Sequence, residues 1–226
     1  MKKTLLLCLL AIVLSFGAVA QNMDITVDNG VRIISCSCYN SGVDEDLQFA
    51  KVMKWAIDRG KEHRDGIKAI DYYSRTLVSE FDWDDDDIKF SSKLQIKVTQ
   101  THYIFSFFDI TAQGGGGIKS LIGMKMDFNK INPEKKEKHK QMQDLFLTKA
   151  QQAATVAYNV IEDSQIEITD WNNVVNGRLT KGMTLDEALL IYGKPITMNS
   201  RDNETQVDFN SFTHVLFIDN KVVRIF

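Results

Sequence analysis

The hydrophobic positions in the first part of the chain change their period between residues 25 and 60. An Asn-Gly turn signal at Asn29 and Gly30 is followed by β-branched residues, which predicts two short strands joined by a tight turn. Apolar residues then recur at helical spacing from Phe49 to Ile57, after three consecutive acidic residues. Gly60 marks the predicted end of this helix. We predict a strand pair and then a helix.

Four stretches of β character follow, at residues 67–73, 76–81, 93–100 and 102–110. In the third stretch Leu94, Ile96 and Val98 alternate with polar residues, which predicts one buried and one wet face. The fourth stretch is apolar on both faces and is therefore expected to be a central strand.

The glycine run within Gln113–Ile118 predicts a flexible loop, because four successive glycines favour no packed conformation. Asn132 followed by Pro133 is typical of a helix start, and one apolar stripe continues from there to about Glu162. We predict one long helix that closes the first part of the chain.

Residues Thr184 to Glu187 form a capping-box pattern, and Gly193 with Pro195 predicts the end of a short helix. Three short antiparallel strands are predicted after it, at 205–209, 214–218 and 221–226, the last two joined by Asp219 and Asn220. The whole pattern predicts an α+β fold: an antiparallel sheet flanked by two helices, then a helix with a three-stranded meander.

The first twenty residues have the order of a cleavable signal peptide. Lys2 and Lys3 precede an apolar run, and small residues at Ala18 and Ala20 form a cleavage signal. Cys8 lies inside the apolar run and not at its end, so it does not predict a lipid anchor. We expect cleavage after Ala20 and export of a soluble periplasmic or secreted protein with no membrane span.

Cleavage would lower the 27 basic residues to 25 against 30 acidic ones, and this balance opposes nucleic-acid binding. The 206 remaining residues are enough for one large or two small domains with a real core.

Two cysteines remain in that part, Cys36 and Cys38, and on a strand they point to the same face. Two buried or edge thiols are the favoured interpretation, and a strained disulfide is the alternative. A metal site would need more ligands than this pair and four scattered histidines supply.

Two motifs suggest ligands but fail on detail. The acidic run from Asp82 to Asp87 resembles a calcium loop in spacing, yet Asp87 and Lys93 stand where glycine and glutamate are required. We expect a solvated acidic turn, with weak calcium binding as the alternative. The glycine run lacks the Gly-Lys-Ser order of a phosphate loop, because Ile118 precedes Lys119 and Ser120.

No short motif brings catalytic groups together. The histidines fall in four different predicted elements and no serine-hydrolase signature is present. Three dispersed tryptophans would form a sugar-binding platform only if folding gathers two of them. The histidines are His63, His102, His139 and His214, and the tryptophans are Trp55, Trp83 and Trp171.

Residues of about 24–163 resemble a family of exported, mainly gut-bacterial proteins of unknown function with a TATA-binding-protein-like (TBP-like) fold. The resemblance rests on the helix LQFAKVMKWAIDRG, the strand segment GIKAIDYYSRTLVSEF and the strand pair KLQIKVTQTHYIFSFFDIT that leads to a long helix. It implies an antiparallel sheet with helices and assigns no activity.

Residues of about 165–226 resemble BamE-like (SmpA/OmlA-like) small modules. There the pattern is a Gly-Met-Thr capped helix, a Gly-x-Pro stop and an antiparallel meander, here at Gly182, Met183, Thr184, Gly193 and Pro195. The lipidated cysteine of the outer-membrane members is missing. The resemblance implies a scaffold that binds other proteins.

We therefore expect a signal peptide at 1–20, a TBP-like domain at 21–163 and a BamE-like module at 164–226. The predicted function is that of an exported, non-enzymatic binding protein of the cell envelope, with no cofactor, no metal and another envelope protein as partner. One alternative is an inhibitor of an envelope or secreted enzyme, which predicts exposed Phe209 and Phe212 on a concave sheet. The other is a cell-wall hydrolase with a site around His102 or His214 assembled only by folding.

Overall fold

The computed structural model describes residues 23–42, 44–60, 66–85, 88–114, 125–134 and 136–226. The predicted signal peptide, the centre of the glycine run with Lys119 and Ser120, His63, Asp86 and Asp87 lie outside the described residues. No helix in the described part of the chain is long and apolar enough to span a membrane.

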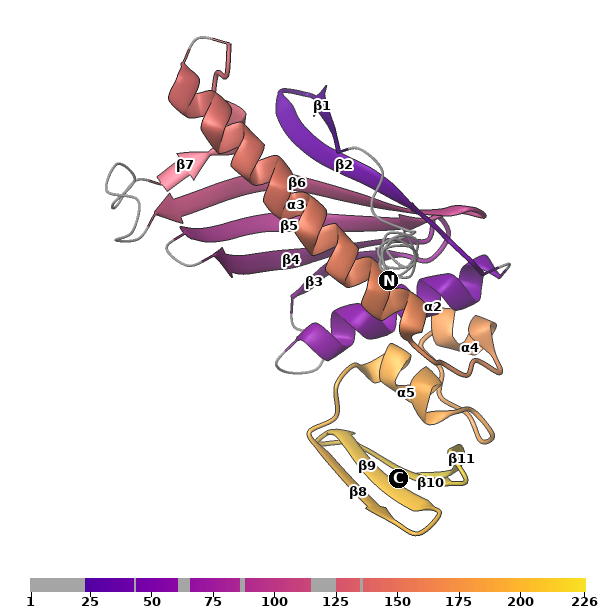
Figure 1. The fold of residues 1–226 in the computed structure, drawn as a ribbon. Helices are drawn as coiled ribbons and strands as arrows, with labels where there is room; N and C mark the ends of the chain where they lie inside the picture. Colours follow the sequence, from indigo (N-terminus) through magenta and orange to yellow (C-terminus); the bar gives the residue numbers. More distant parts are fainter. Residues whose placement is uncertain (1–22, 43, 61–65, 86–87, 115–124, 135) are drawn as a thin grey trace, which may run out of the picture.

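The elements of the first part form one antiparallel sheet in the order β1-β2-β6-β5-β4-β3, with β7 paired to the far end of β6 (Figure 1). The predicted central strand is confirmed, because β6 lies between β2 and β5. The strands are β1 (Asp24–Asp28), β2 (Val31–Tyr39), β3 (Ile67–Asp71), β4 (Thr76–Asp85), β5 (Ile88–Val98), β6 (His102–Gly114) and β7 (Lys125–Asp127).

Local signals position several of these elements as the sequence predicts. The β1–β2 turn has Asn29 and Gly30 at φ values of 50° and 82°, the left-handed conformations that a tight hairpin requires. Helix α2 (Glu45–Arg59) begins at Asp44, whose carboxylate accepts from the backbone N–H groups of Asp46 and Leu47.

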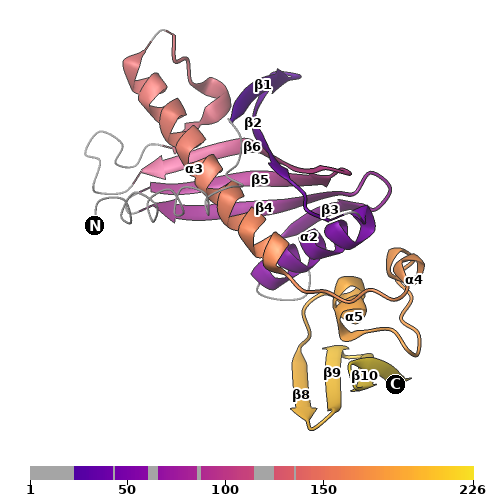
Figure 2. The same ribbon diagram turned by 45° about the vertical axis from the view of Figure 1, so that its right-hand side comes forward.

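Two helices cover one face of the sheet. Trp55 of α2 stacks on Phe81 of β4, and Phe146 of α3 (Glu137–Asp163) packs on Phe90 of β5. Figure 2 shows α3 crossing the strands diagonally along that face. The aromatic residues of β6 that point to the same side, from Tyr103 to Phe107, are fully buried beneath the helices.

Helix α3 begins later than predicted. Asn132 and Pro133 do not start it, and it is preceded by β7 and a short 3-10 helix, η1 (Phe128–Lys130). Its N-cap, Lys136, makes no side-chain capping bond. The reason is that Phe128 and Ile131 are buried in the sheet's core, so the chain must leave the core before the helix can begin.

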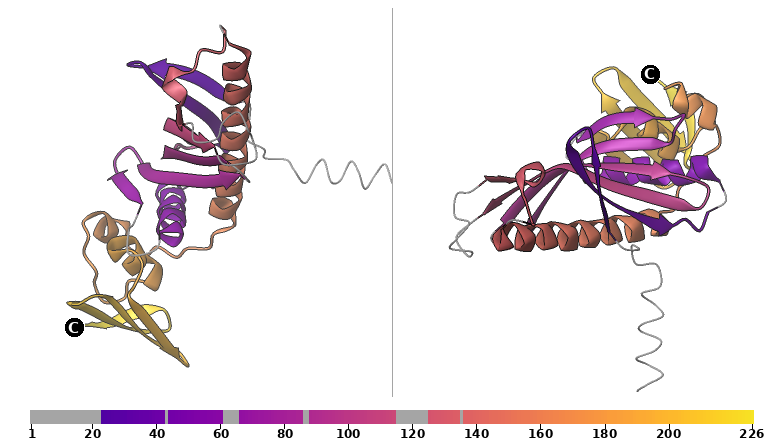
Figure 3. Two further views of the ribbon diagram at one scale, coloured as in Figure 1. Left: turned by 90° about the vertical axis from the view of Figure 1, so that its left-hand side faces the viewer. Right: turned by 90° about the horizontal axis from the view of Figure 1, so that it is seen from above.

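The second part contains two short helices and a separate four-stranded sheet of order β11-β10-β9-β8 (Figure 3). The three predicted strands are present as β9, β10 and β11, and the sheet has a fourth strand that was not predicted. Residues 197–201, which have no alternating apolar pattern, pair in register with β9. The elements are α4 (Trp171–Val175), α5 (Leu185–Tyr192), β8 (Thr197–Arg201), β9 (Glu204–Asn210), β10 (Thr213–Ile218) and β11 (Lys221–Ile225). The α+β class is confirmed by these two antiparallel sheets and their helices.

The two parts of the chain pack against each other. Trp171 of α4 makes edge contacts with Phe49 of α2 and with Tyr72 after β3. Lys194, after α5, donates from Nζ to the backbone oxygen of Gly60 at 3.1 Å. The end of α2 therefore lies at a corner where both parts of the protein meet.

Candidate functional site

The face of the first sheet opposite the helices carries the half-exposed side chains. Along β5 the exposed lysines Lys89, Lys93 and Lys97 point to this open face, while the apolar residues between them are buried. This alternation was predicted from the sequence, but which side the helices would cover was not.

The open face divides into an uncharged and a charged half. On β5 and β4 oppositely charged side chains lie beside one another. Lys93 lies opposite Glu80 in the ladder and forms an ion pair at 2.8 Å with Asp109 of β6. On β2, and on β6 from His102 to Phe108, the residues that face this side carry no fixed charge. We call this half the open-face patch; it consists of Ile33, Ser35, Ser37, Tyr39, His102, Ile104, Ser106 and Phe108.

The open-face patch is ordered by cross-strand register. Ser35 lies opposite Ser106, and Ser37 lies opposite Ile104. At one end the ring of Tyr39, which is 61% exposed, meets the ring of His102 edge-on at 6.1 Å. The patch thus combines aliphatic, hydroxyl and aromatic groups on two paired strands.

Beneath these strands, on the helix-covered side, a buried polar cluster joins β6 to α2 and α3. The hydroxyl of Tyr103 donates to the Gln48 side chain inside the cluster, and at its exposed edge Ser41 donates to the Glu162 carboxylate. Burial, followed by the nearby Glu162 carboxylate, raises the pKa of Tyr103 well above its usual range. One oxygen of Glu162, Oε1, is buried with no hydrogen-bond partner in the described residues.

The cysteine pair lies next to this cluster. Cys36 and Cys38 point to the same face of β2, as predicted, and both thiols are free and buried. A hydrogen bond between them raises the pKa of Cys36 and lowers that of Cys38, while burial opposes the change at Cys38. Neither thiol is exposed enough to act as a surface nucleophile.

The histidines that the structure describes are not brought together. His139 accepts from the backbone N–H of Asn132 at 2.7 Å, whereas His102 lies in the open-face patch. His214 lies on the second sheet, where its Nδ1 is 2.7 Å from Asp208 Oδ1. One condition of the hydrolase alternative, a histidine beside a carboxylate, is therefore met at His214.

The surroundings of His214 do not complete a hydrolase site. Thr197 donates its hydroxyl to the other oxygen of Asp208 at 2.6 Å, and so lies beyond the carboxylate, not beside the imidazole. Bonds from Thr197 and then His214 hold the pKa of Asp208 below its ordinary value. In a catalytic triad the hydroxyl contacts the histidine, so this arrangement positions no nucleophile.

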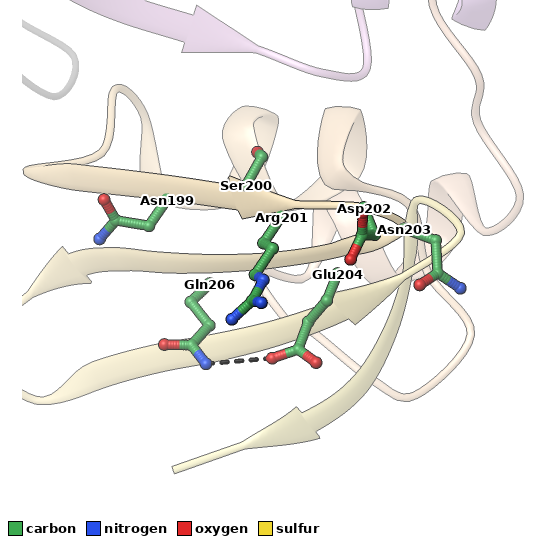
Figure 4. A pocket seen from close by; sticks show the side chains of 7 residues that line it. All are labelled: Asn199, Ser200, Arg201, Asp202, Asn203, Glu204 and Gln206. Atoms are coloured by element: carbon green, nitrogen blue, oxygen red, sulfur yellow. Dashed lines mark hydrogen bonds between the residues drawn. The ribbon is translucent and has the colours of Figure 1, made fainter.

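A shallow polar hollow of about 490 Å³ lies on the β8–β9 hairpin (Figure 4). Arg201, Glu204 and Gln206 project from the same side of the two strands, and Gln206 donates to Glu204 at 3.1 Å. The hollow contains no aromatic side chain. Its lining residues are Asn199, Ser200, Arg201, Asp202, Asn203, Glu204 and Gln206.

The aromatic surface that the inhibitor alternative requires is formed only in part. Phe212, at the β9–β10 turn, is 89% exposed. Phe209 is fully buried, because it points to the inner face of the sheet and packs against Tyr192 of α5. The two phenylalanines therefore do not line one surface.

The acidic run and the tryptophans, which the sequence suggested as ligand sites, occupy positions that serve the fold. Asp82, Asp84 and Asp85 belong to strand β4 and not to a turn, since they pair with residues of β5. No group of three or more potential metal ligands occurs among the residues that the structure describes. Trp55 is buried under Arg59, and Trp171 packs between the two parts of the chain, so these two rings form no sugar platform.

Two solved structures are similar to part of this chain at low identity. No family model and no curated protein matches the chain. A solved structure of a DUF4468 family protein from Bacteroides ovatus is similar over 62% of this chain and 91% of its own, at 11% identity and a TM-score of 0.46. A TBP-like protein from Parabacteroides distasonis is similar over 62% and 98%, also at 11% identity and a TM-score of 0.46. The BamE-like resemblance stays a prediction.

Proposed function

We propose that this protein is an exported, non-enzymatic binding protein of the cell envelope, and that the open-face patch holds a folded partner protein. The proposal of export rests on the signal-peptide pattern of the first twenty residues. The proposal of binding rests on one observation, the separation of the open face into an uncharged patch and a charged border.

The composition of the patch fits the centre of a protein interface. Interface centres are depleted in charged residues and enriched in aromatic ones, and a polar rim surrounds them. Here Ile104 and Phe108 provide apolar area, and Tyr39 provides an exposed aromatic ring. The lysines of β5 and their acidic neighbours on β4 supply the rim on one side.

The patch is also held rigidly. Each of its residues alternates along β2 or β6 with a residue buried in the core, such as Cys36 or Phe105. Binding therefore needs little ordering of the protein backbone, which lowers the entropic cost of association. We expect a partner with an uncharged, mainly apolar surface that accepts hydrogen bonds from the serine hydroxyls.

The test compares two arginine substitutions. Ser106→Arg places a charge at the centre of the patch, whereas Asn159→Arg places the same charge on the exposed side of α3. Each variant and the original protein are immobilised and exposed to envelope extract of the producing organism, and retained proteins are quantified by mass spectrometry. Melting curves establish that both variants fold.

We expect at least one protein that the original chain and Asn159→Arg retain equally and that Ser106→Arg retains at least about tenfold less, because an unpaired charge would be buried. That protein is then purified and its affinity measured directly. The proposal fails if every retained protein binds both variants equally, or if its direct affinity is unchanged by Ser106→Arg.

A further inference from the structure

Strand β8 is an edge strand of the second sheet, and no strand of the described residues pairs with its outer side. It runs along the outside of that sheet and away from the first part of the chain (Figure 2). All five of its residues are exposed, and its register with β9 is unbroken. A regular edge strand presents a row of unpaired backbone N–H and C=O groups, which is a template for one more strand.

The β8 edge differs in charge from the other strand edges of the described residues. Proteins protect edge strands from further pairing with charged side chains and with bulges. The charged residues of the other edges are Asp24 and Asp28 of β1, Lys68 and Asp71 of β3, Lys125 and Asp127 of β7, and Lys221 and Arg224 of β11. Irregularities of register also interrupt the pairing of β3 and β11. In contrast, the segment from Ile196 to Ser200 carries no charge, and Arg201 stands only at the end of β8.

A row of apolar residues crosses the second sheet and ends at this edge. Met198 lies opposite Val207 of β9, Val207 lies opposite Val215 of β10, and Val215 lies opposite Ile225 of β11. Val207 and Val215 are buried, whereas Met198 is 54% exposed. Ile196, which directly precedes β8, is 60% exposed. The open edge therefore carries apolar area that an added strand would cover.

We propose that β8 pairs antiparallel with β8 of a second copy of this chain, about a two-fold axis at Met198. The four strands of each copy then form one continuous sheet. Met198 lies opposite Met198 of the partner subunit, so the apolar row continues across the axis. Thr197 lies opposite Asn199 of the partner subunit, and no charged residues face each other.

A second copy fits this edge because it supplies an uncharged strand of the same length with an apolar residue at the matching position. The same two-fold pairing of β1 is disfavoured. It would place Asp24 opposite Asp28 of the partner subunit, and like charges directly opposite each other destabilise a strand pair. The contact through β8 lies on the second sheet, so it does not depend on the open-face patch of the first sheet.

The expected dimer is transient. A single pair of five-residue strands buries less than the roughly 1,200 Å² of total surface that stable complexes bury, so association should depend strongly on protein concentration. Sedimentation velocity of the purified protein measures this association over a series of concentrations up to about 1 mM, because contacts of this size can be that weak. We expect the sedimentation coefficient of the original protein to rise with concentration.

Two charge substitutions test the axis. Met198→Lys and Met198→Glu each place like charges opposite each other, and each alone should weaken self-association at least about tenfold. An equimolar mixture of the two variants should associate again, because opposite charges then meet at the axis. This recovery is specific to a contact in which residue 198 of one copy faces residue 198 of the other.

Val27→Lys is the matched control, because Val27 is a 66% exposed apolar residue on the edge strand β1 of the first sheet. It should associate as the original protein does, and so should Ser106→Arg. The test of this dimer and that of the open-face patch can therefore fail independently. Melting curves establish that every variant folds.

The proposal is overturned if the original protein stays monomeric over the whole series. It is equally overturned if both Met198 variants associate as the original does, or if their mixture associates no better than either variant alone. Weakening by Val27→Lys instead of the Met198 variants would place the contact at β1 and overturn it as well.

Discussion

The carboxylate of Glu187 accepts a hydrogen bond from the backbone N–H of Thr169 at 2.7 Å, although the residues are 18 positions apart. Glu187 is fully buried, and it also accepts from the backbone N–H groups of Asp170 at 2.5 Å and Thr184 at 2.6 Å. The Glu187 side chain thus caps α5 and also holds the segment between α3 and α4 against α5 by hydrogen bonds.

We predict that Glu187→Gln lowers the free energy of unfolding by about 2–3 kcal/mol, because the amide cannot accept all of these bonds and leaves buried N–H groups unpaired. Urea unfolding followed by circular dichroism measures the change. Glu204→Gln, an exposed residue of the β8–β9 hairpin, serves as control and should change the stability by less than about 0.5 kcal/mol. Equal stability of Glu187→Gln and the original protein would contradict the prediction.

The same carboxylate predicts a dependence of stability on pH. Burial by itself raises the pKa of Glu187, but hydrogen bonds from Thr184, Asp170 and Thr169 outweigh it and leave the pKa below its ordinary value. The unfolded chain therefore binds the proton first, and this stabilisation is present above the ordinary glutamate pKa of about 4.3 and is lost as the pH falls further. The stability difference between the original protein and Glu187→Gln should shrink steadily below that pH. A difference that is constant down to acid unfolding would argue against this assignment.

Gly42 has a steric role beside the buried polar cluster. A Cβ atom on Gly42 would lie 1.7 Å from Nε2 of Gln48, and Gln48 is itself buried and bonded to Tyr103. We expect Gly42→Ala to cost about 1–3 kcal/mol in urea unfolding, because the displaced amide loses its place in the cluster. In a Gln48→Ala background the same substitution should cost much less, since the clash is gone. Costs that simply add in the double variant would show that the two residues do not interact in this way.

Several elements were predictable because their signals are local. The Asn29-Gly30 turn, the Asp219-Asn220 turn and the capping box of Thr184 and Glu187 all form between residues that are close in sequence. The buried face of β5 was equally clear from its alternation. Strand β8 was missed because its exposed residues carry no apolar period, and its partner β9 alone makes it a strand.

The sequence by itself determined the order of most strands and helices, the tight turns and the helix caps, because each depends on backbone preferences and side-chain reach over a few residues. Only the tertiary structure decided where α3 begins and that both helices cover the same face, because these depend on which apolar surfaces bury one another. It also decided that Arg59 lies over Trp55 and Phe81 and that Glu187 reaches Thr169. Such contacts join residues that are far apart in the chain, so no local sequence pattern predicts them.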